Sequence, residues 1–206
     1  MGKKKFVKEY LEPIVIAVLI ALFIRTFIVQ AFKIPSSSME PTLLVGDYIL
    51  VNKFIYGVRI PLMDKKVFEL KKPKRGDIIV FIFPKDRSKD FIKRVIGTEG
   101  EKVEIIRNKI YVDGKLIDDP WGHYSEQSDS RSYFQFMERY GPESVPKDSL
   151  FVLGDNRDNS QDSRFWGFVN VNEVKGKAFV IYFSLDWSAP NLLHKIRWTR
   201  LGKLIH

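Results

Sequence analysis

Hydrophobic residues dominate the chain from Ile14 to Phe32, where only Arg25, Thr26 and Gln30 interrupt them. A helix of this length would reach about 28 Å, close to the ~30 Å hydrocarbon core of a bilayer. The pattern therefore predicts one membrane-spanning helix. Arg25 falls past the middle of that helix, where its side chain can reach the far interface or face protein.

Four lysines precede the apolar stretch: Lys3, Lys4, Lys5 and Lys8. Basic residues beside a span stay on the cytoplasmic side, so we expect residues 1–32 to form a cytoplasmic N-terminus and an anchor, with everything later outside. A cleaved signal peptide has the same basic start, but a charge inside its apolar segment argues against it. A buried core helix is a further alternative, although no matching helices follow it.

After residue 32 the hydrophobic residues come in short runs rich in Val, Ile, Phe and Tyr, separated by Gly, Pro, Asn and Asp. Such runs predict strands, and Asp113-Gly114 predicts a two-residue hairpin turn between two of them. We expect a mostly β domain over 33–188, following one N-terminal transmembrane helix. The predicted strands are Tyr48–Val51, Ile78–Phe83, Phe91–Ile96, Val103–Ile106, Lys109–Val112, Lys115–Ile117, Phe151–Leu153 and Ala178–Phe183.

Two segments do not fit this β pattern. Residues 119–149 are polar, aromatic and rich in turn residues, which indicates an insertion or a flap. Residues 189–206 combine basic with apolar residues and contain no acid. This basic amphipathic tail would either lie on a membrane surface or end in solvent.

Composition narrows the chemistry. The 206 residues suffice for one or two domains, and the absence of cysteine excludes disulfides, a cysteine nucleophile and thiolate metal sites. With 34 basic and 25 acidic residues, the chain favours an anionic neighbour such as lipid headgroups or nucleic acid. Only three histidines are present, which leaves little for a histidine-rich metal site.

A serine run, Ser36-Ser37-Ser38, directly follows the apolar stretch. Serine runs are often linkers, but Pro35 and Pro41 stiffen this one and apolar residues flank it. A serine in a rigid turn can present both its hydroxyl and its backbone N–H to one carbonyl group. The segment is therefore a candidate for nucleophilic chemistry.

Two cations, Lys93 and Arg94, interrupt the apolar run 91–96. Alternation places them on opposite faces of a strand, and the pattern alone does not decide which is buried. One interpretation is an edge strand whose charges deter aggregation. The other is a lysine kept neutral by apolar neighbours, a part that arginine cannot play because it stays protonated.

The segment from Gly154 to Gly167 is dense in Asp, Arg, Asn and Ser. A calcium loop fits poorly, because Arg157 occupies a ligand position counted from Asp155 and no glycine stands at the sixth position. A salt-bridged loop that orients other groups is the better interpretation. Nothing local supports His123 as a triad base, so a serine with a lysine as base remains.

Taken together, four segments resemble the bacterial type I signal peptidases, which are membrane-anchored Ser/Lys endopeptidases. Their order and spacing, over roughly residues 10–185, are specific to that family. Ser37 departs from the glycine of its best-known members, and some relatives have two spans where this chain has one. The matching segments are 35–43, 46–53, 75–78 leading to 92–97, and 154–167.

The resemblance implies a role for individual residues. Ser38 matches the nucleophile and Lys93 the general base, and Ser160 matches the residue whose hydroxyl orients the lysine. The Ser38 N–H and the Ser36 hydroxyl match the oxyanion hole. Supporting ion pairs would join Asp162 to Arg164 and Asp155 to Arg94, and shallow pockets for small side chains would be formed by Phe32, Ile34, Pro35, Leu43, Val80, Phe91 and Ile92.

The implied protein is an enzyme without a metal or other cofactor, placed in the bacterial cytoplasmic membrane. It would remove signal peptides from preproteins after Ala-x-Ala-like sequences, with membrane lipid as a neighbour, the secretion translocon as a candidate partner and no nucleic acid. One alternative is a non-enzymatic, membrane-tethered β module that binds anionic lipid or nucleic acid. Another is a self-cleaving Ser/Lys repressor-type protease, but that needs a DNA-binding helix pair where this chain has its apolar stretch.

Overall fold

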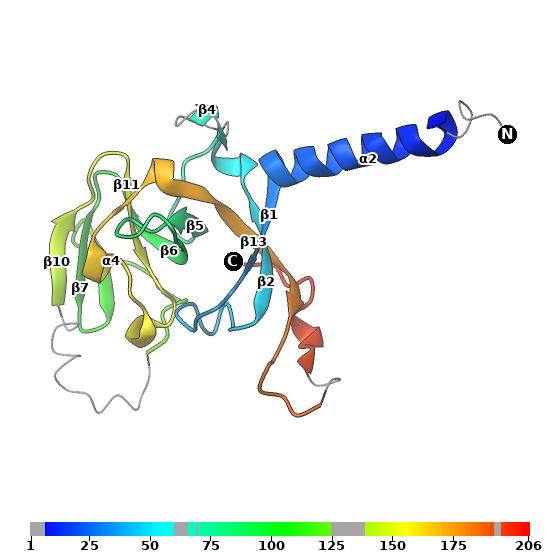
Figure 1. Ribbon diagram of the computed structural model, residues 1–206. Helices are drawn as coiled ribbons and strands as arrows, with labels where there is room; N and C mark the ends of the chain where they lie inside the picture. The colour runs from blue at the N-terminus through cyan, green and yellow to red at the C-terminus, as the bar shows by residue number, and fades with distance from the viewer. Residues whose placement is uncertain (1–6, 60–65, 69, 125–138, 192–194) are drawn as a thin grey trace.

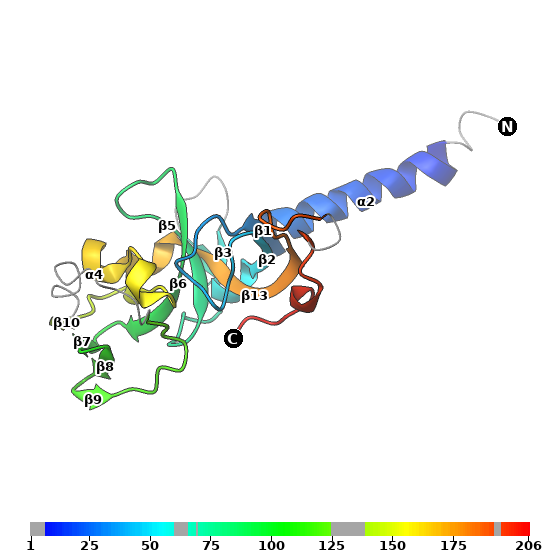
Figure 2. The ribbon, with the colours of Figure 1, turned by 90° about the horizontal axis from the view of Figure 1, so that it is seen from below.

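The computed structural model describes residues 7–59, 66–68, 70–124, 139–191 and 195–206. An N-terminal helical rod projects from a β domain, and both views show it extending away from the sheets (Figures 1 and 2). The rod consists of η1 (Val7–Leu11), α2 (Glu12–Phe23) and η2 (Ile24–Ile28). No residue of α2 is buried, as expected for a helix whose partner is lipid.

The rod is long and apolar enough to cross a membrane, over the 20 residues Glu9–Ile28. The prediction of a helix continuing to Phe32 was wrong at its end. Val29–Lys33 instead forms strand β1, which pairs antiparallel with β2. The cause is tertiary, because the ladder to β2 satisfies the backbone groups that a longer helix would have paired internally.

The main sheet has seven strands in the order β1-β2-β13-β5-β6-β11-β12, and all its neighbours are antiparallel. It confirms the mostly β prediction. The remaining strands of this sheet are β2 (Asp47–Asn52), β5 (Ile78–Ile82), β6 (Asp90–Thr98), β11 (Ser149–Leu153), β12 (Val169–Asn170) and β13 (Val174–Ser184). Short helical turns occur at η3 (Phe54–Tyr56), η4 (Arg157–Asn159), α4 (Ser163–Trp166), η5 (Val171–Glu173) and η6 (Trp198–Arg200).

A smaller sheet has the order β10-β7-β8-β9. The predicted hairpin turn is confirmed: Asp113 and Gly114 have φ of 52° and 75°, the left-handed values that a type I′ turn requires at both positions. Its strands are β7 (Lys102–Ile106), β8 (Lys109–Val112), β9 (Lys115–Leu116) and β10 (Arg139–Ser144), and a two-stranded ribbon joins β3 (Val58–Arg59) to β4 (Lys66–Phe68).

The insertion predicted at 119–149 is only partly separate from the sheets. Strand β10 lies at the edge of the smaller sheet, paired with β7, and is almost wholly exposed. An exposed edge strand has little apolar alternation, so its sequence carried no strand signal. Residues 125–138 lie outside the described part of the chain.

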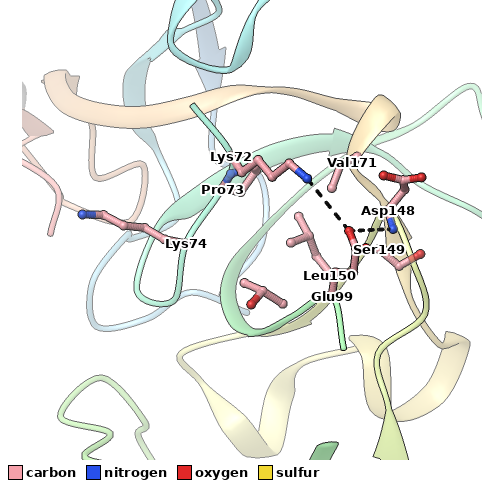
Figure 3. Close-up of a pocket in the computed structure, with 9 residues that line it drawn as sticks. Lys72, Pro73, Lys74, Glu99, Asp148, Ser149, Leu150 and Val171 are labelled. Atoms are coloured by element: carbon pink, nitrogen blue, oxygen red, sulfur yellow. Dashed lines mark hydrogen bonds and ion pairs between the residues drawn. The ribbon is translucent and has the colours of Figure 1, made fainter. Parts of the chain in front are cut away.

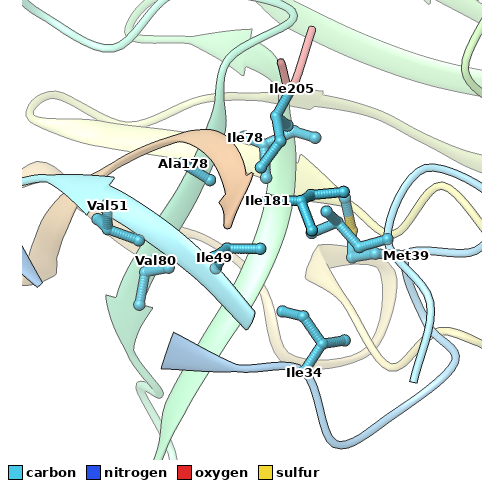
Figure 4. Close-up of a cluster of buried hydrophobic side chains, with 10 residues drawn as sticks. Ile34, Met39, Ile49, Val51, Ile78, Val80, Ala178, Ile181 and Ile205 are labelled. Carbon is cyan, nitrogen blue, oxygen red and sulfur yellow. The ribbon is translucent and has the colours of Figure 1, made fainter. Parts of the chain in front are cut away.

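The first hydrophobic cluster holds the serine turn against the main sheet (Figure 4). Ile34, Met39 and Leu43 come from the turn, and each is at most 2% exposed. They pack with Ile49 and Ile181 of the sheet. The turn is therefore pinned by buried side chains at both ends, as its flanking apolar residues predicted.

The C-terminal segment packs onto the domain instead of forming a separate tail. Ile205 is buried in the first cluster, and Leu204 bridges to Val180 of β13. The Arg200 guanidinium is buried and pairs with the Asp47 carboxylate, which also accepts from Ser184. Trp198 remains exposed, so contact of this segment with a membrane surface stays a prediction, and residues 192–194 lie outside the described part.

Candidate active site

Ser38 lies in the turn that joins β1 to β2. Its side chain is 8% exposed. The turn is closed by backbone hydrogen bonds from Ile34 N–H to Asp47 O (2.8 Å) and from Leu43 N–H to Met39 O (2.9 Å). Together with the buried side chains, these bonds fix the position of the Ser38 hydroxyl relative to the sheet.

Lys93 and Arg94 lie on β6, which runs between β5 and β11 inside the main sheet. The interpretation of this segment as an edge strand was therefore wrong. Lys93 is 4% exposed and Arg94 is fully buried. Both cations can be buried because each has a polar partner from a segment distant in sequence: Ser38 for Lys93 and Asp155 for Arg94. The alternation of residues along one strand cannot indicate such contacts.

The amine of Lys93 donates a hydrogen bond of 2.7 Å to Ser38 Oγ. It also donates one of 2.9 Å to the carbonyl oxygen of Ile92. Across the strand face, Lys93 Nζ lies 5.6 Å from the centre of the Phe91 ring. A serine and a lysine thus meet within hydrogen-bond distance in a mainly apolar environment.

Burial lowers the pKa of Lys93 to about 8, and the Asp162 and Asp155 carboxylates oppose that shift. Removing an ammonium from water disfavours its charged form, which is why the effect of burial is the largest. At a pKa of about 8, about one amine in ten is neutral at pH 7. An ordinary lysine would be neutral in only about one molecule in 2500.

The Arg94 guanidinium binds Asp155 through two hydrogen bonds, Nε to Oδ1 at 2.8 Å and Nη2 to Oδ2 at 2.7 Å. The same carboxylate accepts 2.6 Å from the Thr42 hydroxyl. Arg94 Nη1 also donates to the carbonyl oxygen of His206, 3.0 Å away. This arrangement joins the lysine strand to the serine turn and to the last residue of the chain.

The loop after β11 touches the backbone of the serine turn. Asn156 N–H donates to Ser38 O and Asn156 Nδ2 to Ser37 O, each at 3.1 Å. A Cβ at Gly154 would come within 2.4 Å of Ser38 O and 2.2 Å of Ser160 Oγ. Only glycine permits this approach, because any side chain there would collide with the backbone that carries the nucleophile.

Ser160 follows η4 and is 4% exposed. Its Oγ is buried and has no hydrogen-bond partner among the described residues. The expected contact with the lysine is therefore absent from the part of the chain that is described, and its orienting role stays a prediction.

A further ion pair supports this loop. Arg164 binds Asp162 through Nε to Oδ1 (2.8 Å) and Nη2 to Oδ2 (2.9 Å), in the predicted pair. Asp162 Oδ2 also accepts 3.1 Å from Gly154 N–H. Because Gly154 lies against the backbone of Ser38, this pair is linked to the site through the loop.

Sequence reasoning missed two residues, Asp119 and Trp121, that contact buried arginines of the site. Asp119 binds Arg157, whose Nε donates 3.0 Å to Gly154 O. Trp121 lies with its ring centre 4.5 Å from the Arg94 guanidinium carbon. Both come from the first part of the predicted insertion, and no local pattern sets them apart from surface residues.

The predicted oxyanion donors are the Ser36 hydroxyl and the Ser38 N–H. Neither donates a hydrogen bond to another group among the described residues. Ser36 is exposed, so it can meet a substrate. Of the predicted pocket residues, Ile34, Leu43 and Val80 are buried in the first cluster, with Phe32 and Ile92 packed against it. Phe91 packs in the second cluster, and Pro35 is exposed.

Other candidate groups lie elsewhere. His123 is exposed, and its backbone N–H donates 2.7 Å to Asp155 O, whereas none of the described residues bonds its imidazole. A pocket of about 440 Å³ contains Lys72 and Ser149 (Figure 3). There Lys72 is largely exposed and lies 4.0 Å from a Glu99 oxygen. Lys93, by contrast, is buried and faces a hydroxyl.

The family model and the relatives that match this chain in sequence agree on one class of enzyme. The family model described as signal peptidase, peptidase S26, matches residues 7–183. Signal peptidase I of Pseudomonas fluorescens is 37% identical, over 98% of this chain and 81% of that protein. Signal peptidase I of Aquifex aeolicus is 36% identical, over 86% of this chain and 84% of that protein. A crystal structure of a signal peptidase I from Enterococcus faecalis is 33% identical and covers 52% of this chain and 97% of that one, with a TM-score of 0.42.

Proposed function

Because the chain belongs to the signal peptidase family, peptidase S26, we propose that it is the serine endopeptidase that removes N-terminal signal peptides from exported preproteins. The observation that carries the proposal is the contact between Ser38 Oγ and Lys93 Nζ, 2.7 Å apart and both buried. A serine needs an adjacent base to become a nucleophile, and a lysine with its pKa near 8 is a competent base.

In the proposed acylation step, the neutral Lys93 amine takes the proton of the Ser38 hydroxyl while Oγ attacks the scissile carbonyl carbon. A tetrahedral oxyanion forms. The lysine, now an ammonium, gives its proton to the leaving nitrogen, and the C–N bond breaks. The mature protein leaves with a free amino terminus, and the signal peptide stays on Ser38 as an ester.

Deacylation follows the same steps, with a water molecule as the nucleophile. Lys93, neutral again, takes a proton from a water molecule that attacks the ester carbon. The second tetrahedral intermediate collapses as the lysine returns the proton to Ser38 Oγ. The signal peptide leaves with a free carboxyl group, and no cofactor is needed for the balance of atoms or protons.

The oxyanion would be stabilised by the Ser38 N–H and the Ser36 hydroxyl. Both donors lie on the turn that is pinned by buried side chains, so the backbone that carries them is fixed before the substrate binds. Donors fixed in this way cost no reorganisation in the transition state, and removing one typically costs ~2.7–4 kcal/mol.

We propose that cleavage follows small side chains in an Ala-x-Ala-like sequence. The residues assigned to the pockets are mostly packed in the core, so we expect shallow depressions in place of deep cavities. A shallow apolar wall accepts a methyl group and excludes larger side chains through contact with the buried layer beneath.

The helix Glu9–Ile28 is long and apolar enough to cross a membrane, and we propose that it anchors the protein in one. We propose that this membrane is the bacterial cytoplasmic membrane, with the N-terminal lysines inside and the β domain outside. Ser38 follows the end of the helix by only ten positions, so the nucleophile would stay near the outer surface, where a preprotein's cleavage site emerges. Membrane lipid, and the translocon that delivers the preprotein, are the proposed neighbours.

Cleavage of a purified preprotein by the full chain in detergent tests the proposal. The wild type should release the mature protein with its new N-terminus directly after a small residue. Ser38→Ala should not cleave, whereas Ser37→Ala, in the same turn, should remain active. Cleavage by the Ser38→Ala variant at a comparable rate would contradict the proposal.

A further inference from the structure

A second pocket lies where the helical rod meets the sheet, at the start of β1 in Figure 1. Its volume is about 790 Å³. The rod contributes an apolar wall and one cation, Arg25. The sheet contributes a second apolar wall, and the second cation, Lys53, directly follows strand β2. Its main lining residues are Leu22, Ile24, Arg25, Ala31, Leu50 and Lys53.

The charge of this pocket is one-sided. Arg25 and Lys53 line it, and none of its lining residues is acidic. No ion pair joins either cation to an acid within the described ranges. Two cations that share a pocket without a carboxylate repel each other, so the pocket gains stability from a bound anion.

Lys53 is held in place at the end of the rod. Its backbone N–H donates 2.9 Å to Ile28 O, and its amine donates 2.6 Å to Thr26 O. An ammonium has three donors, so two remain for a ligand. Burial, together with the nearby Lys175, lowers the pKa of Lys53, and a bound anion would reverse that shift.

The position of the pocket suggests which anion it binds. The candidate span ends at Ile28, so Arg25 and Lys53 sit at the level where a bilayer's hydrocarbon gives way to headgroups. Leu22 and Ile24 are exposed and would face acyl chains at the same place. A ligand that fits has a phosphate at the level of the two cations and hydrocarbon along the rod, which describes a phospholipid.

We propose that this pocket binds an anionic phospholipid, with the phosphate between Arg25 and Lys53 and the acyl chains along α2. The guanidinium fork of Arg25 suits two phosphate oxygens, and Lys53 adds a point charge. Because the pocket has no acid to pair with a choline group, it favours a net anionic headgroup such as phosphatidylglycerol. The inference rests on the anchoring of the rod in a membrane, and it is independent of the assignment of Ser38 and Lys93.

Such a lipid would fix the angle between the rod and the sheet. Both cations lie at the junction: Arg25 is in η2, which directly precedes β1, and Lys53 directly follows β2. A phosphate that binds both joins the anchor to strand β2, whose partner β1 leads directly to the serine turn. The bound lipid would thus hold the nucleophile at a set height above the bilayer.

The test uses the full chain in detergent, titrated with phosphatidylglycerol or phosphatidylcholine, with retained lipid counted by native mass spectrometry. One cation beside an anionic lipid strengthens binding roughly fivefold, so Arg25→Gln/Lys53→Gln should bind phosphatidylglycerol about 25-fold more weakly. The matched control is Lys109→Gln/Lys115→Gln, which removes two exposed lysines from β8 and β9 at the far end of the molecule (Figure 2) and should bind as the wild type does. Lys53→Arg should retain most binding.

Three results would overturn the inference. These are equal retention of phosphatidylglycerol by the double variant and its control, equal affinity of the wild type for the two lipids, and displacement of the lipid by inorganic phosphate at millimolar concentration. The last would identify a free anion as the ligand. Cleavage does not enter the readout, and repeating the titration on Ser38→Ala separates this result from the proposed catalytic function.

Discussion

The guanidinium of Arg94 and the carboxylate of Asp155 form two parallel hydrogen bonds of 2.8 and 2.7 Å in the interior of the protein. Arg94 is adjacent to Lys93, and Asp155 also accepts a hydrogen bond from Thr42 in the serine turn. The pair therefore joins the strand that carries Lys93 to the turn that carries Ser38. Neither residue needs to touch the substrate for this.

Arg94→Lys should weaken the protein and leave part of its activity. Lysine keeps the charge but loses the fork that binds both carboxylate oxygens. We expect about 1–3 kcal/mol lower free energy of unfolding, measured by urea denaturation, because buried partners of the guanidinium are left unpaired. Arg75→Lys is the matched control, since its pair with Glu101 is partly exposed and should contribute at most about 1 kcal/mol. An equal loss in both variants would contradict this role.

Ser36→Ala should lower kcat by about 10²–10³ with little change in KM, because the lost hydroxyl acts on the oxyanion and not on the bound substrate. Ser36→Thr should keep much of the activity, since it retains the hydroxyl. Ser37→Ala controls for disturbance of the turn. A near wild-type kcat for Ser36→Ala would remove Ser36 from the mechanism.

The pH dependence of kcat/KM should report the lysine. Only the neutral amine can accept a proton, so the rate should rise about tenfold per pH unit below the pKa of about 8 and level off above it. Ser160→Ala should lower the rate across the range, because the amine loses the hydroxyl predicted to orient it. A profile of kcat/KM that levels off near pH 6.5 would instead indicate a histidine base.

Most strands were predictable because they are buried on at least one face, so their apolar runs are visible in the sequence. β1, β3, β4, β10 and β12 were not. Val29–Phe32 continues the apolar pattern of the helix, and only pairing with β2 makes it a strand. β10 is exposed at a sheet edge, where packing selects few apolar residues.

Site residues that belong to a family motif could be predicted from the sequence. Residues that reach the site only through tertiary contacts could not. Ser38 and Lys93 came from family resemblance, and alternation on β6 could not tell which of its two cations is buried. Asp119 contacts Arg157 of the loop after β11, and Trp121 contacts Arg94 of β6, through tertiary packing alone. Their neighbours in sequence are ordinary surface residues, so no local signal could have identified them.

The proposed topology rests on the lysines that precede the apolar helix. Protease added to cells with a permeabilised outer layer should digest the β domain after residue 32 while the cytoplasmic membrane is intact. The N-terminal lysines should be protected until lysis. Full protection of the β domain before lysis would reverse the proposed orientation.

Replacing Lys93 tests the cost in folding stability of burying its charge. The buried ammonium lowers stability below pH 8 by about 3 kcal/mol, and that cost fades as pH rises from about 8 toward 10.5, where the unfolded chain also loses the proton. Lys93→Met should therefore fold at least as stably as the wild type at pH 7, with the difference shrinking at alkaline pH. Lys93→Arg should fold less well, because its larger ion stays charged.

The single-turnover rate of preprotein cleavage by Lys93→Met, measured on protein shown to be folded, tests the Ser38–Lys93 mechanism most directly. Lys102→Met, which removes an exposed lysine from β7, is the control and should cleave as the wild type does. The mechanism predicts no measurable cleavage by Lys93→Met at any pH, since nothing remains to take the Ser38 proton. Substantial cleavage by Lys93→Met would contradict the assignment and return another base to consideration.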